Sequence, residues 1–288
     1  WATAMENKLR LAIAQTTSYA SHYPNIELLD KIVKEAEQQN IHLLALPEAF
    51  GLLNRNNKVA QGQVVDSDND PFLLACKKHA ARSNLWIQAG STPVRGKVGK
   101  FLNRSTLINN FGKLVAHYDK IHLFDIFLRN KPPTGESDRY EAGKRAVVVE
   151  TDWGKMALTI CYDLRFPKLY RDLAQRGALL AFIPSAFTVP TGKAHWEILL
   201  RARAIENGMW IVAAAQVGEH EDGRRTWGHS LVISPWGEVI CDLGGHKTGL
   251  GFVEINMNEA LSARAQIPAF ESDRDYSIEC IYPIEEGN

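Results

Sequence analysis

The stretch KMALTICYDLRFPKLYRDLAQRGALLAFI, residues 155–183, decides the fold. Residues 155–160 and 179–183 are apolar runs of the kind that form buried strands. Between them, residues 167–176 are predicted to form a helix, because a proline suits its first position and a glycine follows its last. A strand, a helix and a strand in this order predict a parallel βαβ unit, with Cys161 at the carboxyl end of its first strand.

The first third of the chain shows the same alternation of strand and helix. Residues 9–15 and 41–46 are buried-strand runs, and between them apolar side chains recur at helical spacing. That spacing predicts a helix for which Asn25 offers the N-cap. A further helix is predicted over Pro71–Ser83 and a third strand over residues 85–89, so this region also predicts a parallel sheet.

Two pairs of segments echo each other along the chain. Two segments align at a constant offset of 125 residues: STLINNFGKLV at 105–115 and SLVISPWGEVI at 230–240. Each has a glycine where a hairpin turn is expected. LPEAF at 46–50 is echoed by IPSAF at 183–187. These echoes predict two similar halves, and hence two sheets packed on each other with helices outside. Chance similarity between two common hairpins is the alternative.

The second half of the chain predicts one more helix and one more strand. The helix is expected over residues 194–207, followed by a glycine, and the strand over residues 210–216. After Asn256 the sequence is more polar and less periodic. We expect residues 274–288 to form a tail that wraps the body or a partner subunit.

Composition limits the classes of function. The chain has 288 residues with 33 Lys and Arg against 33 Asp and Glu, so nothing electrostatic favours a nucleic-acid or anionic-membrane partner. No apolar run approaches the roughly 18–20 residues that cross a bilayer. Four cysteines without C-x-x-C spacing fit a reducing cytoplasm. We expect residues 1–4 to be a remnant foreign to the natural chain, Met5 to be its start, and residues 5–273 to form one domain.

Three reactive residues follow predicted strands. Glu48, Lys120 and Cys161 each lie just past the carboxyl end of a strand, where open α/β sheets build their sites. We therefore expect them to converge in space, although 72 residues separate the first two and 41 the last two. Taken singly, each has a structural alternative: a solvated loop acid, a surface lysine and a buried apolar thiol.

A thiol at the start of a helix predicts nucleophilic catalysis. The helix dipole and a nearby ammonium are expected to lower the pKa of Cys161 and to raise its thiolate fraction. The backbone N–H of Tyr162 and the Lys120 ammonium are expected to hold an oxyanion. Glu48, desolvated by apolar walls such as Phe50, is expected to shuttle the proton. The predicted chemistry is acyl transfer through a thioester.

Three segments resemble the signature segments of the nitrilase superfamily of carbon–nitrogen hydrolases: LPE at 46–48, DKIHLF at 119–124 and ICYDLRFP at 160–167. The resemblance extends from about residue 9 to about residue 273. It implies an α/β fold in the form of a four-layer αββα sandwich, with two mixed sheets and outer helices. It also implies a Glu–Lys–Cys triad formed by Glu48, Lys120 and Cys161.

The resemblance implies a fourth residue, an acid between the lysine and the cysteine. Glu136 matches it, and Glu141 is the competing candidate. Such an acid would orient Lys120 and help to position the substrate. No step of the implied reaction requires a metal or an organic cofactor. A homo-oligomer, dimer or larger, is also implied, with the tail and the helix after Cys161 as expected surfaces through Leu169, Tyr170 and Leu173.

Further segments are similar to the Nit branch of the superfamily: PSAF at 184–187, TGKAHWE at 191–197, LRARAIEN at 200–207 and WGHS at 227–230. That branch contains amidases acting on deaminated glutathione and ω-amidases acting on α-ketoglutaramate and α-ketosuccinamate. Ser185 and AAAQ at 213–216 favour the first activity. The resemblance thus implies an amidohydrolase that cleaves the terminal amide of a small carboxylate-bearing molecule and releases ammonia.

Four residues are candidates for binding that substrate. Arg165 is the natural carboxylate partner near the nucleophile, with a structural ion pair as the alternative. The segments similar to the Nit branch add Phe187, Thr191 and His195.

Rival classes of protein meet objections in the sequence. A papain-like hydrolase would use His195 or His229 as its base, but its cysteine would not lie mid-chain after a parallel strand. A metal site built from residues 219–222 and His229 lacks fixed helical spacing, so a solvated loop is expected there. Nucleotide-binding glycine motifs are absent. A catalytically silent binding protein on the same fold is the alternative from a different class.

Overall fold

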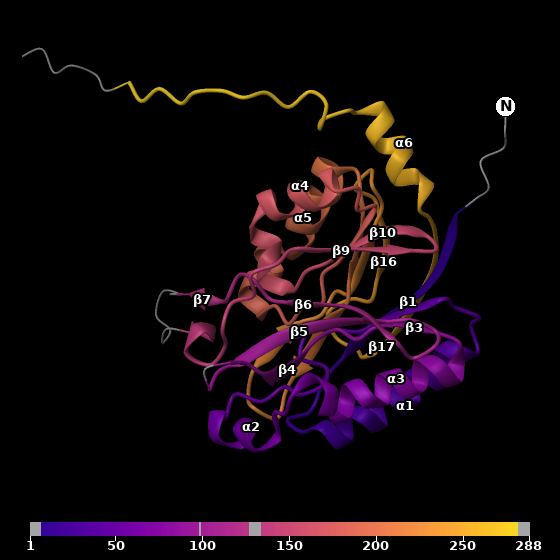
Figure 1. Ribbon diagram of the computed structural model, residues 1–288, viewed down its shortest axis with the longest axis vertical. Coiled ribbons are helices and arrows are strands. Elements are labelled where there is room, and N and C mark those ends of the chain that lie inside the picture. The colour runs from indigo at the N-terminus through magenta and orange to yellow at the C-terminus, as the bar shows by residue number, and fades with distance from the viewer. Residues whose placement is uncertain (1–6, 98, 127–133, 282–288) are drawn as a thin grey trace, which may run out of the picture.

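The computed structural model describes residues 7–97, 99–126 and 134–281. Two mixed β-sheets lie face to face, one of nine strands and one of six. Helices α1 (His22–Glu37) and α3 (Pro71–Ser83) cover the outer face of the larger sheet, while α4 (Pro167–Gln175) and α5 (Val189–Asn207) cover the smaller one (Figure 1). The expected four-layer αββα fold is confirmed. The proposed remnant and Met5 lie outside the described residues.

The larger sheet has the order β14-β13-β1-β2-β3-β5-β4, with β17 paired to β1 and β6 paired to β5. Its strands are β1 (Lys8–Thr16), β2 (Leu43–Ala45), β3 (Trp86–Gln88), β4 (Thr92–Arg95), β5 (Phe101–Ile108), β6 (Leu114–Asp119), β13 (Ala215–Glu219), β14 (Arg225–Trp227) and β17 (Gly249–Asn256). A short helix, α2 (Asn57–Gln63), and a last one, α6 (Asn258–Gln266), flank the layers.

The smaller sheet has the order β16-β15-β12-β11-β10-β9. Its strands are β9 (Val147–Thr151), β10 (Gly154–Leu158), β11 (Leu180–Phe182), β12 (Trp210–Ala213), β15 (Leu231–Ile233) and β16 (Val239–Asp242). A separate two-stranded ribbon joins β7 (Asp125–Ile126) to β8 (Thr134–Gly135).

The two sheets repeat one topology. Strands β1, β2 and β3 are parallel and are followed by the antiparallel hairpin β5–β6, just as parallel β10, β11 and β12 are followed by β15–β16. The first hairpin shifts register between Leu107 and Ile108, and the second between Val232 and Ile233. These bulges lie 125 residues apart, which is the offset of the sequence echo. The prediction of two similar halves is confirmed.

Strand β1 shows why both faces of the sheet are apolar. Leu9, Leu11 and Ile13 belong to the core between the sheets, whereas Ala12 and Ala14 pack with the residues of α1 and α3. Successive side chains of a strand point to opposite faces, so a strand that is covered on both faces has a continuous apolar sequence. Burial of each leucine or isoleucine side chain contributes about 1.5–3 kcal/mol to the stability of the folded state.

Helix α1 begins earlier than its sequence pattern predicted. It starts at His22, with Ser21 at the N-cap, and Asn25 lies inside its first turns. The buried Asn25 side chain accepts a hydrogen bond from the Tyr19 N–H (2.8 Å) and donates to the Gly51 carbonyl (3.2 Å). Asn25 therefore ties the loop before the helix to the segment after β2 instead of capping the helix.

Helix α5 starts at Val189 and not at residue 194. Its early start includes Gly192, where a Cβ would lie 2.3 Å from the Trp227 side chain, so tight packing and not flexibility explains the glycine. The strand expected over residues 210–216 is divided at Ala214. Its first part, β12, pairs with β11 and β15 in the smaller sheet, and its second part, β13, pairs with β1 in the larger one.

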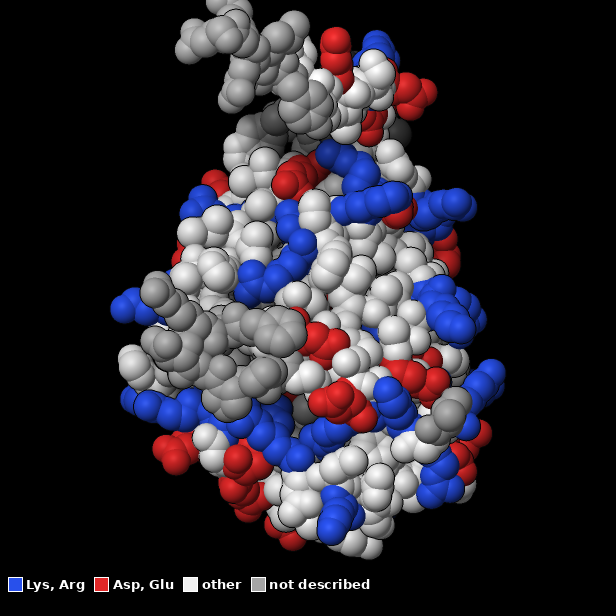
Figure 2. All heavy atoms as spheres, turned by 90° about the vertical axis from the view of Figure 1, so that its left-hand side faces the viewer, with Lys and Arg blue, Asp and Glu red and all other residues white. Residues whose placement is uncertain are grey.

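The prediction that α4 offers a surface for subunit contacts through Leu169, Tyr170 and Leu173 is wrong. Leu169, Tyr170 and Leu173 are 8%, 0% and 2% exposed, because they pack into the core of their own chain. Residues 274–281 of the tail are exposed and extend away from the body (Figure 1), so the described part of the tail does not wrap it. Within the described residues, no helix combines the length and apolarity needed to cross a bilayer. Figure 2 shows acidic and basic side chains interspersed over one face.

Candidate active site

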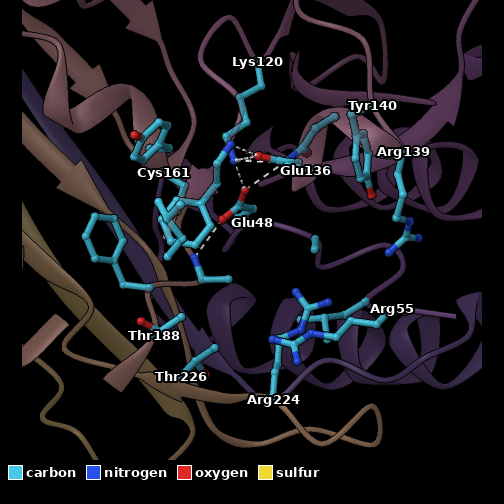
Figure 3. A pocket seen from close by; sticks show the side chains of 18 of the residues that line it. Glu48, Arg55, Lys120, Glu136, Arg139, Tyr140, Cys161, Thr188, Arg224 and Thr226 are labelled. Atoms are coloured by element: carbon cyan, nitrogen blue, oxygen red, sulfur yellow. Dashed lines mark hydrogen bonds and ion pairs between the residues drawn. The ribbon is translucent and has the colours of Figure 1, made fainter. Parts of the chain in front are cut away.

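The ends of three strands meet at one cavity of about 500 Å³ (Figure 3). Glu48 follows β2 and Lys120 follows β6, both in the larger sheet, while Cys161 follows β10 in the smaller one. All three line the cavity and are 6%, 2% and 7% exposed. The structure thus brings the three predicted residues together at the edge where the sheets face each other.

Lys120 is the centre of this arrangement. Its Nζ lies 3.0 Å from Glu48 Oε1, and 3.1 and 2.9 Å from the two carboxylate oxygens of Glu136. Burial alone would lower the pKa of Lys120, but the carboxylates of Glu136 and Glu48 outweigh it and hold the pKa well above its ordinary value. The ammonium therefore stays charged across the physiological range.

Glu136 and not Glu141 contacts Lys120. Glu136 Oε2 also accepts a hydrogen bond from the Phe124 N–H at 2.7 Å, which fixes the carboxylate in place. Glu141 lies elsewhere, where its Oε1 accepts from the Lys97 N–H at 2.6 Å. Of the two candidates for the fourth acid, only Glu136 has the geometry to orient the lysine.

Polar groups and not apolar walls surround Glu48. Oε1 accepts from Asn103 Nδ2 (3.0 Å) as well as from Lys120, and Oε2 accepts from the Ala186 N–H (2.9 Å). Phe50, expected to desolvate this carboxylate, instead stacks on Phe72 beneath the larger sheet, with ring centroids 5.2 Å apart.

Asn103 was not predicted from the sequence. It is buried on β5 between Phe101 and Ser105, two residues away on either side, and these three side chains share one face of the strand. A buried amide in the middle of a strand is the signal that could have identified it, because such a group needs a partner.

Cys161 sits in a strained turn. Its φ is +48°, a left-handed conformation that costs a non-glycine residue of the order of 1–3 kcal/mol and that clusters at functional sites. It starts a short 3-10 turn, Cys161–Arg165, and α4 begins only at Pro167. Tyr162 also lines the cavity, and the first N–H groups of such a turn have no partner within it.

The expectation of a lowered thiol pKa is wrong. Burial, and then the charge of Glu48, raise the pKa of Cys161 well above its ordinary value, and Lys120 only partly offsets them. The neutral thiol is therefore favoured in the resting site. A thiol in this state needs a base before it can act as a nucleophile, and Glu48 is the adjacent carboxylate.

A buried carboxylate behind the cavity, Asp163, links two of these segments. It accepts hydrogen bonds from the Tyr118 hydroxyl (2.7 Å), the Ile160 N–H (2.9 Å) and the His122 N–H (3.1 Å). Tyr118 and His122 flank Lys120 in the chain, while Ile160 precedes Cys161. Asp163 therefore couples the position of the lysine to that of the cysteine.

The four candidate substrate-binding residues separate into two pairs. Phe187 and Thr191 line the cavity. Arg165 and His195 are not among its lining residues, and they contact each other with Arg165 Nη2 3.3 Å from His195 Nδ1. The Arg165 guanidinium lies over the rings of Tyr162 and Phe187, at 5.9 and 5.5 Å. Its role as a carboxylate partner stays a prediction.

Four other arginines, Arg55, Arg139, Arg224 and Arg225, line the cavity, and none of them was predicted from the sequence. Figure 3 shows Arg55, Arg139 and Arg224 on the side away from Cys161. They come from three remote loops without a shared motif, so only the tertiary structure reveals their convergence.

The structure does not form the alternative sites, which were a cysteine–histidine pair and a metal site. Neither His195 nor His229 lines the cavity, and His229 pairs with Asp242 at 3.0 Å. His220 is buried and not solvated, with its ring nitrogens near the Ser18 carbonyl and Thr226 Oγ1. In the part of the chain that the structure describes, no cluster of His, Cys, Asp and Glu could hold a metal ion.

The fold and this site are those of a hydrolase of carbon–nitrogen bonds, and the chain belongs to the carbon–nitrogen hydrolase family, whose model matches residues 10–265. It is 38% identical over 265 residues to a deaminated glutathione amidase of Synechocystis sp., covering 90% of this chain and 96% of that protein. The resemblance to the nitrilase superfamily is confirmed.

Two solved structures support the assignment. The C. elegans NitFhit protein matches with a TM-score of 0.85 and 33% identity, over 93% of this chain and 65% of that one. This chain thus spans slightly less than two thirds of the NitFhit protein. Saccharomyces cerevisiae Nit3, a member of branch 10 of the nitrilase superfamily, matches with a TM-score of 0.81 and 25% identity, over 91% and 94% of the two chains.

Proposed function

We propose that this carbon–nitrogen hydrolase is an amidase in which Cys161 is the nucleophile, Glu48 the general base and acid, and Lys120 the electrostatic partner held by Glu136. The observation that carries the proposal is the contact of Lys120 Nζ with both Glu48 and Glu136 in the cavity that Cys161 lines. A buried thiol, a carboxylate and an ammonium in one cavity are the parts that acyl transfer through a thioester needs.

The proposed cycle moves one proton back and forth. Glu48 takes the Sγ proton as sulfur bonds to the amide carbon, and then gives it to the amide nitrogen as the carbon–nitrogen bond breaks. Cys161 is left as a thioester and the amine departs. Glu48 next takes a proton from water as the water oxygen attacks the thioester carbon. The carbon–sulfur bond breaks, and the proton returns to sulfur.

The negative charge that develops on the carbonyl oxygen needs donors in both halves of the cycle. We assign this role to the Lys120 ammonium and the Tyr162 backbone N–H. Losing one such donor typically costs about 10²–10³ in rate. The raised pKa of Lys120, which its two carboxylate neighbours cause despite burial, supports an ammonium that keeps its charge throughout.

For the substrate we propose a linear amide that carries a carboxylate, with deaminated glutathione as the first choice and an ω-amide such as α-ketoglutaramate as the alternative. The name of the Synechocystis relative supports the first choice. The two differ in the leaving group: the amide nitrogen of deaminated glutathione bears the rest of the peptide and leaves as an amine, whereas an ω-amide releases ammonia.

Turnover of a substrate panel tests the proposal. Deaminated glutathione, α-ketoglutaramate, glutamine and a simple aliphatic amide are assayed for both amine and ammonia, with a nitrile as a control. Cys161→Ala is expected to lose more than about 10³-fold in rate, while Cys280→Ala, on the exposed tail, keeps the rate. Full activity in Cys161→Ala would rule out the thioester. No turnover of any amide would favour a silent binding protein.

We also propose a homo-oligomer that acts in the cytoplasm. Ile198, Ile205 and Trp236 are 70%, 55% and 53% exposed, and the first two share a face of α5. Such a patch is typical of an interface. Free thiols at Cys76, Cys161, Cys241 and Cys280 support a reducing compartment. Sedimentation that shows only monomer would contradict the oligomer.

A further inference from the structure

The cavity has two ends of opposite charge. At the inner end, Glu48 and Glu136 place two carboxylates against the single ammonium of Lys120. On the side away from Cys161, Arg55, Arg139 and Arg224 place three guanidinium groups along the same cavity (Figure 3). A substrate that carries both a neutral amide and a carboxylate is therefore oriented by charge, with its amide inward and its carboxylate toward the arginines.

The arginines retain unused hydrogen-bonding capacity. Arg139 donates through Nη2 to the Asn54 carbonyl (2.8 Å), but its buried Nε has no partner among the described residues. Arg224 contacts Asp222 through only one side of its guanidinium group, with Nε and Nη2. A guanidinium has five N–H groups, and buried ones are normally paired. These donors are thus available to an anion.

The charges of two arginines also act on each other. Desolvation, and then the positive charge of Arg224, lower the pKa of Arg55, and Asp222 only partly compensates. Like charges held close together in the free protein repel, and an anion bound between them would remove that cost. The arrangement therefore favours an anionic ligand over an empty subsite.

Exposure indicates which half of the substrate this end receives. Arg55 is exposed and Arg139 and Arg224 are half-buried, whereas Cys161 is 7% exposed, so the arginines lie toward the open end of the cavity. In the thioester cycle the acyl half stays bonded to sulfur while the amine leaves and water enters. An amine that lies toward the opening can leave without passing the acyl half.

From these observations we infer that Arg55, Arg139 and Arg224 form a subsite for a carboxylate on the leaving amine, such as the C-terminal carboxylate of a short peptide. The inference rests on the amidase function proposed above and adds the class of leaving group. It makes peptide-like amides better substrates than primary amides that release ammonia.

A matched pair of substrates tests the subsite. Glutaryl-Ala-Gly and its C-terminal amide differ only at the end of the leaving half, which is a carboxylate in the first and a neutral amide in the second. We expect the free acid to have a kcat/KM about tenfold higher, the typical gain of a charge-assisted hydrogen bond. Arg55→Gln, Arg139→Gln and Arg224→Gln should each bring this ratio toward one, and added salt should reduce it in the unmodified enzyme. Arg82→Gln, on the outer helix α3, is the control.

Arg55→Gln is the variant expected to fold normally, because Arg55 is exposed. Arg139 and Arg224, in contrast, form bonds to Asn54 and Asp222 that their substitution would break. A ratio unchanged in all three variants would overturn the subsite. Glutaramate and pentanamide form a second pair, in which the carboxylate lies on the acyl half. If the variants alter that ratio and not the first, the assignment to the leaving half is wrong.

Protection of Cys161 from iodoacetamide separates this inference from the proposed function, because it needs no turnover. Mass spectrometry would follow the labelling of Cys161 in the presence of each peptide. Stronger protection by glutaryl-Ala-Gly than by its amide, lost in Arg55→Gln, supports the subsite even if neither peptide is hydrolysed. Equal protection by the two peptides would overturn it.

Discussion

At the scale of single residues, the site holds a thiol that is kept neutral beside the Glu48 carboxylate. Burial and then Glu48 raise the pKa of Cys161, so the resting sulfur is poorly ionised. The strained φ of +48° keeps it at the cavity. On the proposed mechanism, reactivity depends on proton transfer to Glu48 during attack and not on a preformed thiolate.

This pairing predicts opposite effects of Glu48→Gln on two reactions. Amide hydrolysis should fall by about 10²-fold or more, because the base is lost. The charge of Glu48 raises the thiol pKa, so its removal should lower that pKa and increase the thiolate fraction at any pH below it. Alkylation by iodoacetamide should then speed up, with its pH profile shifted toward lower pH. Slower alkylation in Glu48→Gln at every pH would contradict this account.

Lys120→Met should destabilise the protein as well as inactivate it. The change leaves the carboxylates of Glu48 and Glu136 without their ammonium, and breaking a buried pair in this way costs about 3–5 kcal/mol. Urea denaturation measures the loss. Lys168→Met is the control, because its ion pair with Asp172 is exposed and contributes less than about 1 kcal/mol. Equal effects of the two substitutions would contradict the prediction.

The raised pKa of Lys120 also makes the stability of the fold depend on pH in the alkaline range. A group whose pKa is higher in the folded state stabilises the fold fully below its unfolded pKa, about 10.4 for lysine, and loses that contribution as pH rises further. The free energy of unfolding should therefore fall more steeply above about pH 10 in the unmodified protein than in Lys120→Met. Parallel curves would show that Lys120 is not coupled to folding.

At the scale of elements, the segment after β3 is shaped around the loop that carries Glu48. Gly90 has a φ of +59°, and a Cβ there would lie 1.9 Å from the Pro47 carbonyl oxygen. Pro47 directly precedes Glu48, so the two loops cannot separate without moving Glu48. The glycine is thus required by close backbone approach and by backbone conformation together.

Gly90→Ala should lower the free energy of unfolding by about 2 kcal/mol or more, through strain and overpacking. It should also lower kcat, because Glu48 moves with Pro47. Gly62→Ala is the matched control: nothing lies within 4 Å of its Cβ position, and it belongs to helix α2. Alanine at that position should be neutral or stabilise by up to about 1 kcal/mol. Thermal unfolding that ranks the two variants in the reverse order would refute this.

At the scale of the whole molecule, the exposed apolar face of α5 predicts self-association. Ile198→Lys combined with Ile205→Lys should weaken the oligomer without destabilising the chain, because both side chains are largely exposed, at 70% and 55%. Sedimentation over a range of concentrations measures the shift. Val59→Lys, an exposed position on α2, is the control. An unchanged sedimentation profile in the double variant would exclude this face as the interface.

The sequence by itself determined the two-layered sheet architecture and predicted which three residues meet at the cavity. The periodicity of apolar residues indicates which face of each element is buried. The two similar hairpin sequences predict that β15–β16 repeats β5–β6, and the bulge lies at the same position in both hairpins. Glu48, Lys120 and Cys161 were recognisable because each follows a strand.

Only the tertiary structure decided how the site is built and which charges face it. The chain changes sheets at Ala214, which an unbroken apolar run does not reveal. Asn103 and the arginines Arg55, Arg139 and Arg224 have no local pattern, because long-range packing and not chain spacing brings them together. The thiol pKa depended on burial and on Glu48, and both act through space. Local pattern encodes which face of an element is buried, whereas the electrostatics of a site depend on groups that the chain brings together only when it folds.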